Sequence, residues 1–188
     1  MTAAMRRFRS ESTAQCYERN VNDTSSAQIR RAEAREATRI AEIFNQGVED
    51  RIATFETRPA TPGDVDRWIA EDLVVVAERD GVLVGWAKAG PYTDRHYYYD
   101  GVREATLYVA RESRRIGVGH ALLERLADEA AALGAHKLVG KVFNTNEPSI
   151  ALLRGLSWRE VGVHRRHGRL DGEWRDVLVV EKLLDPPE

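Results

Sequence analysis

Residues 107–120 read Leu107-Tyr108-Val109-Ala110-Arg111-Glu112-Ser113-Arg114-Arg115-Ile116-Gly117-Val118-Gly119-His120. The apolar start predicts a buried strand, and the helical spacing after the glycines predicts a long helix over 119–133. Gly117 and Gly119 permit close backbone approach, while the free N–H groups of a helix N-terminus attract an anion. Two neighbouring arginines add donors suited to a pyrophosphate. The stretch therefore predicts a phosphate-binding turn. The same residues would also fit an ordinary surface turn with solvated arginines.

Two common phosphate-binding loops do not fit this spacing. The pair Gly117-x-Gly119 lacks the third glycine of a dinucleotide-binding Rossmann loop, and the turn does not follow an early strand in the first third of the chain, as a Rossmann loop does. The Gly-Lys-Ser/Thr of a Walker loop is also absent from the sequence. The fold therefore has to be argued from the order of elements around the turn.

Further strands and helices are expected on both sides of this turn. Strands are expected at 28–31, 73–78, 82–89, 105–110, 137–143, 158–165 and 173–183, and helices at 37–48, from 61 onward, at 119–133 and at 148–156. Arg79-Asp80-Gly81 is a hairpin signal between the second and third strands. This order predicts one mixed α/β unit over residues 28–184, with 185–188 as a tail. Residues 1–27 are polar and predict a solvated extension, with an Arg-rich transit peptide as the alternative.

The overall composition narrows the class of protein. The chain has 188 residues, a formal charge of -2, and 43% hydrophobic residues, which suits one soluble domain and gives no electrostatic case for nucleic acid or membrane binding. Cys16 is the one cysteine, so a reducing, cytoplasmic setting is expected. The histidines and carboxylates show no zinc or EF-hand spacing, so no metal is expected.

The motif Arg114-x-x-Gly117-x-Gly119 after a strand resembles the acyl-coenzyme A pyrophosphate signature of the GNAT superfamily of N-acetyltransferases. Other segments are similar to those of the phosphinothricin acetyltransferase group, and together they span about residues 28–182. These segments are Thr54-Phe55-Glu56, Ala89-Gly90-Pro91, Glu104-Ala105-Thr106-Leu107-Tyr108-Val109, Asn146-Glu147-Pro148-Ser149 and Gly172-Glu173-Trp174-Arg175-Asp176-Val177. The resemblance implies a mixed central sheet of about seven strands flanked by helices. It also implies a V-shaped split between the fourth and fifth strands, 105–110 and 137–143.

The resemblance implies acetyl-CoA as the co-substrate. Its pantetheine arm would enter the split and bind backbone groups of Leu107 and Val109, with the pyrophosphate on residues 114–120. The implied cofactor residues are Leu107, Tyr108, Val109, Arg114, Arg115, Ile116, Gly117, Val118, Gly119, His120, Asn146 and Ser149. Asn146 has a second interpretation, since an asparagine there also suits the N-cap of the helix that follows.

Acetyl transfer to an amine requires a general base, and the resemblance implies Glu104. The alternative is an exposed glutamate paired with Arg103. Many members of the family carry a tyrosine or histidine that protonates the thiolate at the position held here by Leu153, so the general acid is open among Tyr108, His120, His164 and water. The backbone N–H of Leu107 is the expected donor to the developing oxyanion.

The family resemblance implies small acceptors with a free α-amine, such as phosphinothricin, methionine sulfone or methionine sulfoximine. The expected acceptor-binding residues are Phe55, Arg95, Tyr97, Tyr99 and Arg103. A homodimer is expected, with the aromatic residues of this loop and Trp174 suited to the interface. Two other functions stay open: an acetyltransferase acting on protein or peptide N-termini, and a module that binds acetyl-CoA without catalysis.

Overall fold

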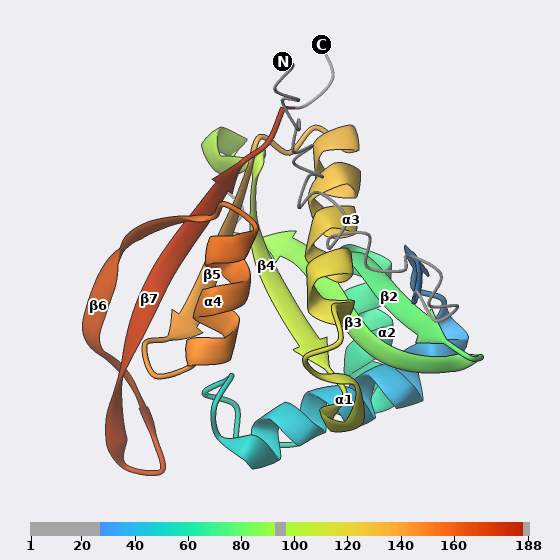
Figure 1. The fold of residues 1–188 in the computed structure, drawn as a ribbon, viewed down its shortest axis with the longest axis horizontal. Coiled ribbons are helices and arrows are strands. Elements are labelled where there is room, and N and C mark those ends of the chain that lie inside the picture. The colour runs from blue at the N-terminus through green and yellow to red at the C-terminus, as the bar shows by residue number, and fades with distance from the viewer. Residues whose placement is uncertain (1–26, 93–96, 186–188) are drawn as a thin grey trace, which may run out of the picture.

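The computed structural model describes residues 27–92 and 97–185, with the backbone but not the side chain of Tyr97. Its centre is a seven-stranded sheet in the order β1-β2-β3-β4-β5-β7-β6 (Figure 1). The strands are β1 Gln28–Arg31, β2 Leu73–Arg79, β3 Val82–Pro91, β4 Val102–Val109, β5 Lys137–Phe143, β6 Arg159–Leu170 and β7 Glu173–Leu183. Neighbouring strands pair antiparallel except β4 and β5, which are parallel. The expected mixed sheet is confirmed.

Helices cover both faces of this sheet. The helices are α1 Ala37–Asp50, α2 Pro62–Glu71, α3 Val118–Ala132 and α4 Glu147–Gly155, and single 3-10 turns lie at Ala34–Glu36, Tyr97–Tyr99 and Arg111–Ser113. One buried cluster joins α1 and α2 to Val76, Trp86 and Tyr108. A second joins α3 and α4 to Val75 and Ala87. Side chains alternate between the two faces of a strand, so consecutive residues of β2 and β3 contribute to opposite layers.

Local sequence signals account for most element ends. Thr61 caps α2, where its hydroxyl accepts from the backbone N–H of Asp64. Asp80 and Gly81 both take positive φ, 53° and 75°, in the tight turn between β2 and β3. The predicted bounds of β1, β5 and β7 are confirmed to the residue.

Two strands, β4 and β6, extend furthest beyond their predicted bounds. β4 begins at Val102 rather than 105, and β6 continues to Leu170 rather than ending at 165. Of the added residues, Arg166, His167 and Arg169 are polar and exposed, whereas Leu170 at the end is buried. Backbone pairing with β7 resumes at Gly168 after a register shift between His164 and Gly168. Hydrophobic patterning does not detect such a strand end, because backbone pairing with β7 holds it and its burial shows no period.

The structure also corrects the expectation of a fully buried fourth strand. β4 is central in the sheet, but of its eight residues only Tyr108 is buried. The β4–β5 ladder covers Val102–Ala105 against Lys137–Gly140 and stops there. The rest of β5 continues to pair with β7, up to Phe143 against Val177, so the two parallel strands diverge (Figure 1). The predicted split between the fourth and fifth strands is confirmed.

Candidate active site

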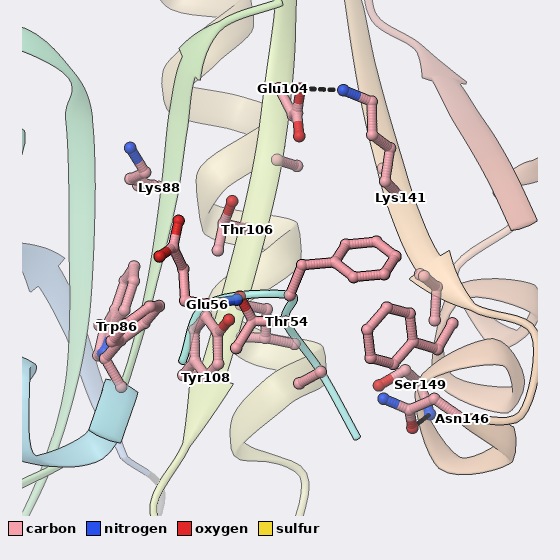
Figure 2. A pocket seen from close by; sticks show the side chains of 18 of the residues that line it. Thr54, Glu56, Trp86, Lys88, Glu104, Thr106, Tyr108, Lys141, Asn146 and Ser149 are labelled. Atoms are coloured by element: carbon pink, nitrogen blue, oxygen red, sulfur yellow. Dashed lines mark hydrogen bonds and ion pairs between the residues drawn. The ribbon is translucent and has the colours of Figure 1, made fainter. Parts of the chain in front are cut away.

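A cavity of about 700 Å³ opens where β4 and β5 separate. Its walls come from residues 53–58 between α1 and α2, from β3, β4 and β5, and from the start of α4. Polar side chains of several elements point into it, among them Glu56, Lys88, Glu104, Thr106 and Lys141 (Figure 2). The site is therefore built on the split itself, with a loop closing one side.

The C-terminal half of β4, beyond the ladder with β5, offers an open backbone edge to this cavity. The Ala110 N–H donates to Val84 O at 2.9 Å, so Ala110 turns its backbone toward β3. Backbone groups point to alternate sides along a strand, so Leu107 and Val109 turn theirs toward the gap left by β5. An extended chain carrying amide groups, such as the pantetheine arm of coenzyme A, matches such an edge as an added strand would.

The turn between β4 and α3 brings a helix N-terminus to the mouth of the same gap. Gly117 is the N-cap of α3 with φ 89°, a conformation that favours glycine, and it has no side chain with which to cap the first turn. A Cβ on Gly119 would lie 3.1 Å from Leu152 Cδ2 and 3.4 Å from Leu107 Cδ2, so the helix start approaches β4 and α4 closely. The geometry fits the predicted pyrophosphate site.

Two arginines of this turn, Arg111 and Arg114, are held by the carboxylate of Asp50 on α1. Arg114 Nη2 lies 2.8 Å from Asp50 Oδ2, and its Nε donates to Val109 O at 3.1 Å. Arg111 also binds Asp50, at 2.7 Å. Burial acts to raise the pKa of Asp50, but the two guanidinium groups outweigh it and hold that pKa below its ordinary value. Asp50 therefore stays ionised and fixes Arg114 beside the end of β4.

The other residues of the turn differ in their surroundings. Arg115 takes a positive φ of 65° and is exposed, as is Ile116. His120 pairs with Glu124 on the surface of α3, with Nδ1 and Oε2 3.0 Å apart. Val118, in contrast, is buried in the cluster beneath α3.

Glu104 faces the cavity and forms an ion pair across the two parallel strands. Its Oε2 lies 2.7 Å from Lys141 Nζ on β5, at the level where the ladder ends (Figure 2). The Lys141 ammonium also lies 5.7 Å from the centre of the Tyr92 ring. Glu104 is therefore not paired with its neighbour Arg103, which was the alternative interpretation of the sequence.

Tyr108 forms the inner wall of the cavity. Its ring packs against Phe44 and Trp86, with centroids 5.0 and 5.1 Å apart, and leaves no room for a side chain at Gly47. Burial raises the pKa of Tyr108 to about 12, although a hydrogen bond with Thr54 acts in the opposite direction. The hydroxyl is therefore protonated over the ordinary pH range.

Asn146 is a helix cap and also lines the cavity. Its Oδ1 accepts from the backbone N–H of Ser149 at 3.3 Å, and its Nδ2 donates to Ile52 O at 3.0 Å. The capping interpretation is thus confirmed, and it places Asn146 between α4 and the loop after α1. Leu153 is buried in the core beneath α4, so this position supplies no proton donor.

The predicted acceptor-binding residues do not all meet in the cavity. Phe55 lines it and packs edge-on against Phe143, with ring centroids 4.7 Å apart. Tyr99 is largely exposed and contacts Tyr92 on the loop before β4. Arg95 and the side chain of Tyr97 lie outside the described residues.

Arg103 requires a correction. It lines a second depression, together with Arg31 and Leu133, and not the cavity that contains Glu104. The reason is strand alternation, since adjacent residues of β4 point to opposite faces of the sheet. The same rule, applied to the sequence, would have separated Arg103 from Glu104.

Several cavity residues were missed by the sequence analysis. Lys141, Lys88 and Thr106 each interrupt a run of small or apolar residues within a strand, and that interruption was the available signal. Glu56 enters from the loop after α1, and its position depends on how that loop folds over the sheet. The family resemblance includes the segment Thr54-Phe55-Glu56, but periodicity and spacing alone do not place this loop at the cavity.

Within residues 27–92 and 97–185, no cluster of three or more histidine, cysteine or acidic side chains is arranged to hold a metal ion. Over the same ranges, none of the helices has the length and apolarity needed to cross a membrane.

Comparisons with known proteins agree with this geometry. The pattern of the acetyltransferase (GNAT) family matches residues 38–158. A phosphinothricin N-acetyltransferase of Streptomyces viridochromogenes is 33% identical over 164 residues, which cover 85% of this chain and 89% of that protein.

Two solved structures have the same fold. A ribosomal-protein-alanine N-acetyltransferase from Brucella melitensis is 30% identical with a TM-score of 0.80, covering 84% of this chain and 99% of that one. A phosphinothricin acetyltransferase from Sinorhizobium meliloti, in complex with acetyl-CoA, is 28% identical with a TM-score of 0.79, covering 85% and 89%.

Proposed function

Because this chain belongs to the acetyltransferase (GNAT) family, we propose that it acetylates the free α-amine of a small amino acid or amino-acid analogue. Acetyl-CoA is the acetyl donor. Phosphinothricin, methionine sulfone and methionine sulfoximine are the acceptor types we favour. The observation that carries the proposal is the position of Glu104, which faces the cavity within one residue of the point where the β4–β5 ladder ends.

The donor binds along the open edge of β4. Backbone groups of Leu107 and Val109 pair with the amides of the pantetheine arm, which extends the sheet into the gap. The pyrophosphate lies on the N-terminus of α3, where Gly117 leaves the first N–H groups accessible. Arg114, fixed by Asp50, adds positive charge beside it.

Glu104 acts as the general base. It takes a proton from the acceptor's ammonium group, directly or through water, and the neutral amine then attacks the thioester carbonyl. The backbone N–H of Leu107 donates to the oxygen on which negative charge develops. Glu104 lies on the same face of β4 as Thr106 and Tyr108, toward the cavity, and this supports its approach to an amine bound there.

The thiolate leaves as the anion and is protonated by the bulk solvent after its release, so the transfer needs no general acid in the site. Leu153 has no proton to give, His120 is paired with Glu124 on the surface of α3, and His164 is an exposed residue of β6 that does not line the cavity. Tyr108 lines the cavity, but burial raises its pKa to about 12. That pKa is higher than the pKa of an ordinary thiol, which is roughly 8.5, so proton transfer from Tyr108 to a thiolate is unfavourable. A thiolate is also a good enough leaving group to depart as the anion.

An acceptor panel tests this function. Purified protein is incubated with acetyl-CoA and each of phosphinothricin, methionine sulfone, methionine sulfoximine, the common L-amino acids and a short peptide with a free N-terminus, and released thiol is measured. Turnover of at least one small α-amino acid is expected. Turnover of the peptide alone would favour a protein N-terminal acetyltransferase, and binding of acetyl-CoA by calorimetry without any turnover would favour a non-catalytic module.

A homodimer is the assembly we expect. The exposed aromatic residues Tyr98, Tyr99 and Trp174 are of the kind that concentrates in subunit interfaces. Size-exclusion chromatography with light scattering measures the mass directly. A monomer at high protein concentration would contradict this expectation.

A further inference from the structure

The side chain of Lys141 takes a position on Glu104 that resembles that of a bound substrate amine. Lys141 is the first residue of β5 beyond the ladder with β4, and its ammonium reaches Glu104 Oε2 at 2.7 Å. An alkylammonium ion at hydrogen-bond distance from this carboxylate has the chemistry of the acceptor amine that Glu104 would deprotonate. The acceptor and Lys141 therefore compete for one carboxylate.

The other cations that line the cavity are held by different carboxylates. Arg58 and Arg67 both bind Asp64. Lys88 binds Asp72 at 2.6 Å, and the Asp72 side chain is only 8% exposed. Among the described lysines and arginines of this cavity, Lys141 is thus the one whose partner is the proposed base.

The pair between Glu104 and Lys141 is easily opened. The two side chains are 31% and 39% exposed, and ion pairs that face solvent contribute little to stability. The Tyr92 ring, 5.7 Å from Lys141 Nζ, offers the ammonium a second favourable contact when it leaves the carboxylate. Separating the pair for a ligand therefore costs little.

An α-amino acid matches an opened ion pair of this kind. Its ammonium and carboxylate are attached to the same carbon, so the protein groups that receive them have to be neighbours of opposite charge. Glu104 and Lys141 are such neighbours, and both line the cavity. We propose that the acceptor inserts as a zwitterion between them, with its amine on Glu104 and its α-carboxylate on Lys141. Lys141 is then a specificity-determining residue that selects α-amino acids over simple amines.

This inference rests on the proposed function and deepens it. It predicts that the enzyme distinguishes an amino acid from its carboxamide, because the amide keeps the amine but has lost the charge that Lys141 binds. A charge-assisted hydrogen bond of this kind corresponds to about a 10- to 100-fold effect on binding. Removing Lys141 should erase most of that discrimination.

The test measures kcat/KM for the best amino acid of the acceptor panel and for its α-carboxamide, in wild type, Lys141→Met and Lys141→Arg. In Lys141→Met, kcat/KM for the acid should fall about 10- to 100-fold through a rise in KM. The value for the amide should change less than about threefold. Lys141→Arg keeps the charge and should retain a clear preference for the acid.

Lys137→Met is the matched control. Lys137 lies on the same strand and face, pairs with Glu181 at 3.1 Å and does not line the cavity. Glu181 keeps Arg159 as a partner, at 3.0 Å, when Lys137 is removed. This variant should retain the wild-type ratio between acid and amide. Circular dichroism checks the fold of every variant.

The outcomes separate this inference from the function on which it rests. If wild type acetylates no α-amino acid, the proposed function fails and the inference fails with it. If wild type is active but Lys141→Met keeps the ratio, or loses acid and amide activity equally, only the role of Lys141 is overturned. If Lys141→Met does not fold, Lys141→Arg becomes the deciding variant. Loss of the preference for the acid over the amide in Lys141→Arg would then contradict the inference.

Discussion

The bare α-carbon of Gly47 on α1 lies directly against the ring of Tyr108 on β4. A Cβ at position 47 would stand 2.5 Å from Tyr108 Cε1 and 2.8 Å from its Cδ1, closer than packed atoms approach. Phe44 and Trp86 close off the other sides of the ring. Glycine at this point lets α1 pack onto the strand that forms the inner wall of the cavity.

Gly47→Ala should therefore destabilise the protein, although alanine is the better helix former. Overpacking of a buried site costs about 1–3 kcal/mol, against about 1 kcal/mol gained in helix propensity. Urea unfolding measures the difference, and kcat/KM should fall as the Tyr108 ring is displaced. Gly155→Ala on α4 is the control, because a Cβ there meets nothing within 4 Å. Equal behaviour of the two variants would contradict the packing argument.

A charge at the start of α3 should abolish binding of the donor. Gly117→Glu places a carboxylate where the proposed pyrophosphate binds. It also forces a residue with a side chain to adopt a φ of 89°, which strains the backbone. The dissociation constant for acetyl-CoA, measured by calorimetry, should rise by about 100-fold or more.

The backbone strain of that variant has its own control. Gly172, in the turn between β6 and β7, has a similar φ of 84°, and a Cβ at either glycine meets nothing within 4 Å. Gly172→Glu should therefore show a comparable loss of stability with unchanged affinity for acetyl-CoA. If a folded Gly117→Glu protein binds acetyl-CoA as tightly as wild type, the anion site and the residues assigned around it are refuted.

Local patterns in the sequence were sufficient to predict most of the fold. The apolar stripe of α1, the Thr61 cap and the Asp80-Gly81 turn each specify an element from residues that are neighbours in sequence. The end of β6 was missed because residues 168–170 pair with β7 beyond a register shift, and no periodic burial in the sequence marks that pairing.

The site was predicted less completely, since it depends on which distant residues meet. The glycine turn and Glu104 could be proposed from the sequence because each belongs to a local motif. The pairing of Glu104 with Lys141 spans 37 positions and follows from the parallel register of β4 and β5. Strand alternation separates Arg103 from Glu104 without knowledge of the partner strand, but Lys141 could be placed beside Glu104 only once that register was known.

The stability of the fold at high pH should depend on Tyr108. Burial raises the pKa of this hydroxyl to about 12 in the folded protein, against about 10 in an unfolded chain. The folded pKa is the higher one, so the contribution of Tyr108 is complete below about pH 10 and is lost as the pH rises through about 12. Over this range the free energy of unfolding should fall by about 2–3 kcal/mol.

Tyr108→Phe removes the titrating group and should lose this part of the pH dependence. Denaturant unfolding of both proteins between about pH 9 and 12 gives the difference in free energy of unfolding, which should fall as the pH rises. Tyr98→Phe is the control, because Tyr98 is 58% exposed. A difference that stays constant with pH for Tyr108→Phe would show that its hydroxyl ionises equally easily in the folded state.

Glu104→Gln should separate catalysis from donor binding. The amide keeps the size of the side chain but cannot accept a proton from the acceptor, so kcat should fall by about 100-fold or more. Affinity for acetyl-CoA should be nearly unchanged, because Leu107, Val109 and the start of α3 are untouched. Steady-state thiol release and calorimetry measure the two quantities on the same preparation.

Glu160→Gln provides the matched substitution outside the cavity. Glu160 also pairs with a cation, Arg154 at 2.6 Å, so both variants lose the charge of one exposed ion pair. Only Glu104→Gln should be slow, because only Glu104 faces the gap between β4 and β5 where the thioester is expected to lie. Turnover at the wild-type rate in Glu104→Gln would remove Glu104 from the mechanism and assign deprotonation of the amine to water.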